Sequence, residues 1–297
     1  MIIIPDVHGR DFWRKPVEEN AGKDHILFLG DYLDPYPYEG IASQDIFPRL
    51  EDIIALKKEH PETITLLLGN HDLHYINNDI GGSRYDYEYA ERNRKFFLEN
   101  ACLFQIAFIS ETDSKKILFT HAGLKEGWLR RYESIFATME VATAVDTMNA
   151  MWNDTSHRDI LMSMMADIPY SRWGRSRYGS PVWNDIDDMD DDIEELPGWY
   201  QVFGHSQQRR YPIIGRHFAC LDCRRVFRLT EDGTIDDMQK IQVTIDDARM
   251  AVARIKQLKQ MVDEGMPESE ISKTELKQLA RILSDYKSQT EIYDEME

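Results

Sequence analysis

The chain has 297 residues, of which 42% are hydrophobic and 11% aromatic, so it can bury one large core or two modest ones. Its 53 acidic and 35 basic residues give a formal net charge of −18. This charge argues against nucleic acid polymers and anionic membranes as partners, because both carry the same sign. No apolar run approaches the roughly 20 residues of a membrane-spanning helix.

The first residues, Met1 to Asp6, lack a basic region, and their apolar run is too short for a signal peptide. The three cysteines (Cys102, Cys220 and Cys223) are too few for a disulfide framework, which favours a reducing cytoplasm. Cys220 and Cys223 form a single Cys-x-x-Cys pair. Without a second pair, we expect two buried thiols and not a zinc or redox site.

Five short apolar runs occur in the first 205 residues. They span residues 2–4, 25–29, 64–68, 117–119 and 200–203. Most are continuously apolar, as is typical of strands that are buried on both faces. The segments 43–60 and 85–100 carry apolar residues at helical spacing. This alternation predicts an α/β fold with helices outside the sheet.

Residues 125–197 interrupt the alternation and contain a predicted helix over 138–151. The run 185–195 carries eight acidic residues in eleven positions. It lacks the ligand spacing of an EF-hand, so we expect a solvated loop there and not a cation site.

The last part of the chain combines closing strands with helices. Residues 220–241 predict strands with a hairpin turn at Asp232-Gly233. Thr244 is suited to cap a helix that ends near Gly265, and Ser272 begins a capping-box pattern for a second helix. We expect this C-terminal helical hairpin to pack on the preceding domain, with a dimerisation arm as the alternative. No pattern in the sequence indicates an oligomeric state.

A cluster of Asp, His, Asn and Gly follows each of the five apolar runs. The clusters are Asp6-Val7-His8-Gly9, Gly30-Asp31-Tyr32-Leu33-Asp34, Gly69-Asn70-His71-Asp72, Thr120-His121-Ala122-Gly123 and Gly204-His205-Ser206. Ligands of α/β sheets collect at the carboxyl ends of strands. Imidazole and carboxylate groups suit Zn, Mn and Fe, and the absence of cysteine disfavours a structural zinc. One such cluster is ordinary turn chemistry, but five in succession indicate a metal site.

The order of these motifs resembles the calcineurin-like metallophosphoesterase superfamily, and within it the serine/threonine phosphoprotein phosphatases and their bacterial relatives. The resemblance extends from Asp6 to His205. It implies an α+β sandwich of two packed mixed β-sheets flanked by helices. We therefore expect a metallophosphoesterase domain over residues 1–241, in which 125–197 is an insertion or cap over the site. Residues 242–297 form a C-terminal helical extension.

The same resemblance implies a role for each motif residue. Asp6 and His8 would bind a first metal ion, Asp31 would bridge both ions, and Asn70, His121 and His205 would bind the second. His71 would be the general acid held by Asp34, while Asp72 would support that loop. For Asp34 a turn-capping role is the alternative, and we favour the functional one.

The implied cofactors are two divalent or trivalent transition-metal ions, with Mn favoured and Fe or Zn as alternatives. Two cations about 3.5–4 Å apart clamp a phosphoryl group and lower the pKa of a water between them. The expected reaction is hydrolysis of phosphate monoesters, of a phosphoprotein or a small molecule, by in-line attack of a metal-bridging hydroxide. A non-catalytic scaffold is disfavoured because no ligand is missing.

Two other reactions stay open: hydrolysis of nucleotides or dinucleoside polyphosphates, and phosphodiester cleavage. For a nucleotide, Trp173, Tyr178 and Trp183 offer stacking surfaces, although such aromatics are more often cap core. His74 is open between lining the site and lying on a loop surface.

The sequence departs from the phosphoprotein phosphatases at Pro35, where these enzymes carry an arginine that grips phosphate. This departure weakens the assignment of a phosphoprotein substrate. Another cation should supply this charge. The candidates are Arg84, Arg172, Arg175, Arg177, and Arg209 or Arg210.

Overall fold

A computed structural model of the chain describes residues 1–208, 211–238 and 245–267, together with residues 271, 275, 276, 279, 280, 282, 283 and 286. The chain divides into two compact units, Met1–Met238 and Gln239–Glu297. The first unit contains both β-sheets and all five motifs.

The first sheet is mixed, with strand order β11-β10-β1-β2-β3-β4. Its strands are β1 (Ile2–Ile4), β2 (Ile26–Phe28), β3 (Ile64–Leu67), β4 (Phe104–Gln105), β10 (Phe227–Leu229) and β11 (Ile235–Asp237). Strands β1 to β4 run parallel, while β10 is antiparallel to both β1 and β11. The β10–β11 hairpin turns at Asp232-Gly233, as the sequence predicts.

The second sheet is also mixed, with strand order β5-β6-β7-β9-β8. Its strands are β5 (Ala107–Glu111), β6 (Lys116–Thr120), β7 (Trp199–Phe203), β8 (Ile213–Ile214) and β9 (Phe218–Cys220). Strands β6, β7 and β9 run parallel, and β5 and β8 are antiparallel edge strands. The five predicted apolar runs are therefore confirmed as β1, β2, β3, β6 and β7.

Successive residues of a strand point to opposite faces of its sheet. One face of each sheet packs against the other sheet, and the opposite face packs against helices. Ile3 and Leu27 of the first sheet share a buried cluster with Phe119 and Val202 of the second. Ile2, next to Ile3 on the same strand, belongs instead to the cluster beneath the helices. Burial on both faces explains why these strands are continuously apolar.

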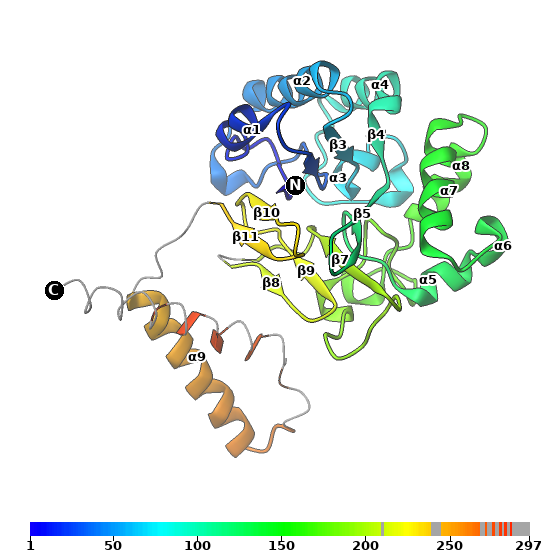
Figure 1. Ribbon diagram of the computed structural model, residues 1–297. Coiled ribbons are helices and arrows are strands. Elements are labelled where there is room, and N and C mark those ends of the chain that lie inside the picture. The colour runs from blue at the N-terminus through cyan, green and yellow to red at the C-terminus, as the bar shows by residue number, and fades with distance from the viewer. Residues whose placement is uncertain are drawn as a thin grey trace. The chain divides into compact units, whose positions relative to one another are not determined.

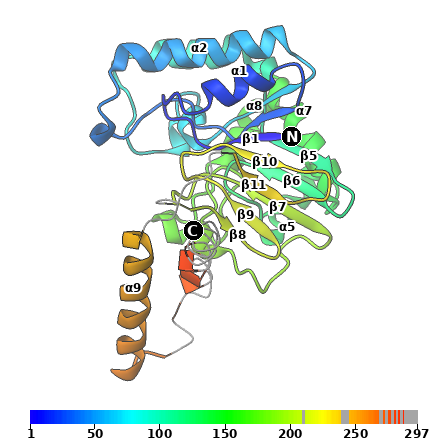
Figure 2. The same cartoon turned by 60° about the vertical axis from the view of Figure 1, so that its left-hand side comes forward.

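Helices α1 (Arg14–Asn20), α2 (Ser43–Glu59) and α4 (Ala90–Glu99) follow β1, β2 and β3 in the chain. Figure 1 and Figure 2 show α1 and α2 together on one side of the first sheet. The predicted helix over 43–60 is confirmed. The helix predicted from residue 85 begins later, because the Asp86 side chain accepts hydrogen bonds from the backbone of Glu88 and Tyr89.

The segment between β6 and β7 contains a group of helices (Figure 1). They are α5 (Glu126–Arg131), α6 (Glu133–Phe136), α7 (Val141–Asn153) and α8 (Arg158–Met165). Glu140 caps α7 through the backbone N–H groups of Ala142 and Thr143, so the helix predicted over 138–151 is confirmed with a slightly later start. Asn149 of α7 also bonds the backbone of Ala107 in β5.

Several short 3₁₀ turns connect these elements. They are η1 (Pro37–Glu39), η2 (Asn78–Ile80), η3 (Ala101–Leu103), η4 (Tyr170–Arg172) and η5 (Ile186–Asp188). The sequence predicted a solvated loop over the acidic run 185–195. This prediction holds only in part, because Asp185 and Asp191 are buried. Asp185 pairs with Arg172, and Asp191 accepts a backbone N–H from Arg216.

In the second unit, α9 (Ile245–Asp263) ends where Gly265 adopts a positive φ of 105°. Arg254 of α9 forms an ion pair of 2.7 Å with Glu275. The predicted caps Thr244 and Ser272 lie outside the described residues, and so does most of the second helix of the expected hairpin. Within the part of the chain that is described, no helix is long and apolar enough to span a membrane.

Candidate metal centre

The carboxyl ends of five strands meet at one place and are joined there by backbone hydrogen bonds. The N–H of His8, after β1, donates to the carbonyl of Asp31, after β2, at 2.6 Å. The N–H of Gly204, after β7, donates to the carbonyl of His121, after β6, at 2.8 Å. These bonds fix the directions in which the motif side chains leave the strands.

The turns at this place are conformationally unusual. Of the eight non-glycine residues with positive φ in the described chain, five belong to this region. They are His8, Asp31, Asp34, Arg84 and His205. A left-handed backbone costs roughly 1–2 kcal/mol for most residues, and such strain clusters at functional sites.

Asp31 lies between two groups of metal-binding donors. Its Oδ2 is 3.5 Å from Nε2 of His8 and 3.4 Å from Nε2 of His121. One group contains Asp6, His8 and Asp31, and the other contains Asp31, His121 and His205. The shared position matches the bridging role that the sequence resemblance implies for Asp31.

Asn70 and Asp6 complete the constellation. Oδ1 of Asn70 lies 2.9 Å from Nδ1 of His205 and 3.1 Å from Nε2 of His121. Both carboxylate oxygens of Asp6 lie 3.0 Å from the backbone nitrogen of His205. The structure therefore brings all six predicted ligands together.

The two inner histidines are oriented by backbone carbonyls. Nδ1 of His8 donates to the carbonyl of Leu33 at 2.7 Å, and Nδ1 of His121 donates to that of Leu29 at 2.8 Å. Each bond places a proton on Nδ1 and turns Nε2 toward the centre, where a bound metal ion would take its lone pair. Metal-bound histidines are commonly held in this way.

The electrostatics of the centre favour cations. Although burial opposes the charged form of His121, the adjacent carboxylates of Asp31 and Asp6 raise its pKa to about 10. Burial alone would raise the pKa of Asp31, but His121 and His71 hold it well below its ordinary value. Burial lowers the pKa of His8 to about 3, so its imidazole is neutral. Nε2 of His205 is buried and has no hydrogen-bond partner among the described residues. This donor set of oxygen and imidazole nitrogen fits transition-metal ions.

The short helix α3 (Asn70–Leu73) carries His71 beside the centre. Nδ1 of His71 lies 2.9 Å from Oδ2 of Asp34. The carboxylate of Asp72 accepts backbone N–H groups at 2.8–2.9 Å from Asp31, Tyr32 and Gly69. Asp72 thus fixes the β2 and β3 loops against each other.

The sequence interpretation missed two side chains at the site, Tyr75 and Tyr36, and left His74 open between lining the site and lying on a loop surface. His74 and Tyr75 are buried against Asp34, and the Tyr36 ring lies 5.8 Å from that of His8. A signal for the first two was present, because residues three and four after His71 lie on the same face of a helical turn. No pattern in the sequence pointed to Tyr36.

Two of the six candidate arginines reach the site. Nη2 of Arg84 lies 3.2 Å from Nε2 of His71, and its guanidinium stacks 3.7 Å above the Tyr36 ring. Arg172 donates to Oγ of Ser206 at 2.8 Å, next to His205. Arg175 and Arg177 are exposed, and Arg209 and Arg210 lie outside the described residues.

The other residues that the sequence singled out are two cysteines and three aromatic residues. Cys220 and Cys223 are free and buried, as predicted. Trp183 stands 5.3 Å from the His205 ring, whereas Trp173 is 94% exposed and so is not part of a cap core. Tyr178 packs against the main core.

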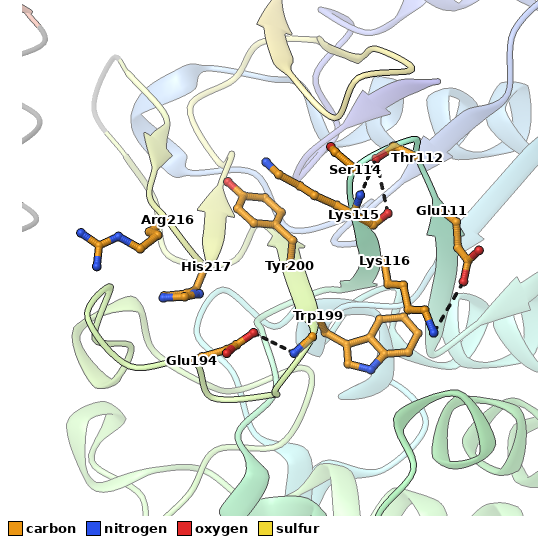
Figure 3. A pocket seen from close by; sticks show the side chains of 11 residues that line it. Glu111, Thr112, Ser114, Lys115, Lys116, Glu194, Trp199, Tyr200, Arg216 and His217 are labelled. Atoms are coloured by element: carbon orange, nitrogen blue, oxygen red, sulfur yellow. Dashed lines mark hydrogen bonds and ion pairs between the residues drawn. The ribbon is translucent and has the colours of Figure 1, made fainter.

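A separate pocket of about 470 Å³ is lined by none of the predicted metal ligands. Figure 3 shows the side chains that line it. Lys116 and Trp199, the first residues of β6 and β7, line it, so it sits at the amino ends of strands whose carboxyl ends form the centre. Lys116 pairs with Glu111 at 4.0 Å. This pocket brings no group of metal-binding donors together among the described residues.

Two mixed sheets packed together, with histidines and carboxylates converging from their strand ends, are the architecture of a metallophosphoesterase. The chain belongs to the calcineurin-like phosphoesterase family, whose model matches residues 2–209.

Individual relatives are distant. The chain is 24% identical over 216 residues to the serine/threonine-protein phosphatase 6 catalytic subunit of Drosophila melanogaster, covering 71% of this chain and 59% of that protein. It therefore spans somewhat more than half the length of this relative.

Solved structures of similar proteins include a mutant of a cold-active protein tyrosine phosphatase (17% identity, TM-score 0.47, 80% of each chain). Another is a protein serine/threonine phosphatase from Saccharomyces cerevisiae with similarity to human phosphatase PP5 (14% identity, TM-score 0.47, 81% of this chain and 79% of that one).

Proposed function

We propose that the protein is a dinuclear metal-dependent phosphatase that hydrolyses phosphate monoesters. The observation that carries this proposal is the convergence of Asp6, His8, Asp31, Asn70, His121 and His205, with the His71–Asp34 pair beside them. Two bound cations would neutralise the phosphoryl oxygens and activate a water for attack in line with the leaving group. Mn is the favoured metal, with Fe or Zn as alternatives.

The residues around the metal ligands support a proton-transfer role for His71. Hydrolysis of a monoester breaks the bond between phosphorus and the leaving oxygen, and that oxygen needs a proton. In its imidazolium form His71 would donate the Nε2 proton, because Nδ1 is directed at Asp34. The Asp34 carboxylate holds the ring in place and balances its charge.

Arg84 is the cation that we propose in place of the arginine absent at Pro35. Its Nε donates to the carbonyl of Asp34 at 2.9 Å, and its Nη2 lies beside His71. Among the described residues, no carboxylate is within ion-pair distance of Arg84, so its charge is available to a phosphate. The Tyr36 ring covers one face of the guanidinium and holds its plane.

The proposed substrate class is a phosphorylated protein side chain or a small phosphate ester. The name of the Drosophila relative supports the first of these. Trp183, beside His205, favours a second candidate, which is hydrolysis of a nucleotide or dinucleoside polyphosphate with a base stacked on the indole. Phosphodiester cleavage is an alternative that the same centre would support.

We also propose that residues 125–197 act as a cap over the centre, since from this segment Trp183 packs against His205 and Arg172 donates to the adjacent Ser206. The three free thiols support a cytoplasmic location.

The test begins with protein stripped by a chelator and reloaded with Mn, Zn, Fe or Mg. We expect metal-dependent hydrolysis of an aryl phosphate. Assays with a phosphopeptide, a dinucleoside polyphosphate and an aryl phosphodiester then rank the substrate classes. Asp31→Asn and His71→Ala should each lower kcat by about 100-fold or more. Rates equal to the parent's would refute the assignment.

Arg92 of α4 is the matched control for Arg84. Its guanidinium also stacks on an aromatic ring, 4.0 Å from the centroid of Phe47, but this ring is not part of the metal centre. We expect Arg84→Ala to raise KM and the inhibition constant of inorganic phosphate by about tenfold or more, with partial recovery in Arg84→Lys. Arg92→Ala should behave as the parent does. An unchanged inhibition constant in Arg84→Ala would exclude this role.

A further inference from the structure

The Asp34 carboxylate is the meeting point of three side chains. Its Oδ2 lies 2.9 Å from Nδ1 of His71 and 2.8 Å from Nε2 of His74, while its Oδ1 accepts the hydroxyl of Tyr75. An ionised carboxylate has about four lone-pair sites, so it can accept all three donors. The burial of Asp34 and His74, which are 4% and 1% exposed, excludes water as a substitute partner.

The three donors come from a single turn of chain. His71 lies in α3, His74 is its C-terminal cap with helical φ and ψ, and Tyr75 follows directly. The spacing of three and four residues directs their side chains to the same side. Asp34 approaches from the loop after β2, with a positive φ of 60°.

His74 is itself held firmly. Its ring stands edge-on to Tyr75 and Tyr85, with centroids 4.4 and 4.8 Å apart. Gly82 passes so close that an added Cβ would overlap Nδ1 of His74. A ring packed in this way keeps Nε2 pointed at Asp34, and loss of that partner would leave a buried polar atom unsatisfied.

This arrangement removes a freedom that Asp34 would otherwise have. A carboxylate bonded only to His71 is free to rotate about its last torsion and carry the imidazole with it. We propose that His74 and Tyr75 are positioning residues, which fix the Asp34 carboxylate and thereby the proton-donating ring of His71. The inference rests on the proposed phosphatase function.

A cation site is the competing explanation, because Asp34, His71 and His74 offer donor atoms within 4.8 Å of one another. The 2.9 Å contact between His71 and Asp34 has the length of an ordinary hydrogen bond, and the 2.8 Å contact between His74 and Asp34 is a direct polar contact of ion-pair distance. The Tyr75 hydroxyl already occupies the other carboxylate oxygen. Both observations favour a hydrogen-bonded cluster.

The experiment compares two monoesters that differ in their need for a proton donor. A nitrophenyl phosphate has a good leaving group, the nitrophenolate ion. The leaving group of an alkyl phosphate such as phosphoserine is a strongly basic alkoxide, which needs a proton. His74→Leu and Tyr75→Phe should lower kcat for the alkyl ester about tenfold or more, with a much smaller loss for the aryl ester. KM and metal content should stay at parental values.

Two further variants make the result specific. His74→Gln places an amide donor near the position of Nε2 and should restore much of the alkyl-ester activity. Tyr200→Phe removes a buried hydroxyl that bonds the carbonyl of Phe218, far from Asp34, and should match the parent on both esters. If His74→Leu does not fold, Tyr75→Phe and His74→Gln still decide the question.

Each contrary outcome has a distinct meaning. Equal losses on both esters, or a change in KM alone, would overturn the positioning role. Loss of a bound metal equivalent in His74→Leu would overturn it in favour of the cation site. A parent protein without metal-dependent turnover would refute the proposed function, and this inference with it.

Discussion

A Cβ atom added at Gly69 would overlap Oδ1 of Asp31, at well under the 3.0 Å that such atoms keep, and would lie 2.7 Å from Cε1 of His121. The φ of Gly69 is −101°, which any residue adopts. Glycine is therefore required at this turn for space and not for backbone freedom. The carboxylate of Asp31, which both donor groups share, occupies the space that this Cβ would need.

Gly69→Ala should consequently displace Asp31 and lower metal content and kcat, the latter by about 100-fold. Gly40→Ala is the matched control, because Gly40 has a φ of 64° but no atom within 4 Å of an added Cβ. That variant should lose about 1 kcal/mol of unfolding free energy and keep its turnover. Metal analysis and urea denaturation distinguish the two. Parental metal content in Gly69→Ala would contradict the steric argument.

The interface between the sheets should dominate stability. Leu27 is fully buried there on a central strand, so Leu27→Ala should lower the unfolding free energy by about 2–5 kcal/mol. Ile160→Ala, at a side chain that is 47% exposed, should change it by no more than about 0.5 kcal/mol. Urea midpoints report both, and similar midpoints would mean that the sheets do not share this core.

Stability should fall at high pH through Tyr132. Its hydroxyl donates to Asp167 at 2.8 Å, and burial together with this carboxylate raises its pKa from 10 to about 12. The folded state thus holds the proton more tightly, and the contribution is complete below pH 10 and is lost as pH rises through about 12.

Tyr132→Phe should therefore cost about 1–2 kcal/mol at neutral pH and show a smaller decline between pH 10 and 12 than the parent does. Tyr170→Phe, whose ring is 68% exposed, is the control. Urea denaturation at neutral and alkaline pH measures the difference. Parallel declines in Tyr132→Phe and the parent would show that this pair does not set the slope.

The three thiols should differ sharply in reactivity. Cys102 is exposed, while Cys220 and Cys223 are buried. Burial raises the pKa of the Cys220 thiol well above its usual value and that of Cys223 to about 12. A thiol reagent at neutral pH should modify Cys102 first, and the other two only after unfolding. Cys102→Ser should abolish the fast phase, and rapid labelling that persists in this variant would contradict the burial.

The strands and the motifs were predictable because both signals are local. An apolar run such as residues 64–68 requires a buried strand, and the glycine and polar residues that follow it mark the carboxyl end. The start of α4 was placed too early because the Asp86 turn competes with the helix. The role of the acidic run was also misjudged, since burial of Asp185 depends on Arg172.

Other features depend on contacts that no local pattern encodes. The sequence offered six arginines, and the fold brings Arg84 and Arg172 to the site. For His74 the sequence left two positions open, the site and a loop surface, and the aromatic rings packed around it decide for the site. The position of β10 beside β1 was equally hidden, because the two strands are more than two hundred residues apart.

That pairing of β1 with β10, in which Ile3 faces Phe227, has a consequence for biosynthesis. Strand β1 leaves the ribosome more than two hundred residues before β10, which is one of its two neighbours in the sheet. During elongation this flank of Ile2–Ile4 stays open to incorrect partners. Nascent chains halted before residue 227 should therefore depend on chaperones far more than the finished protein does.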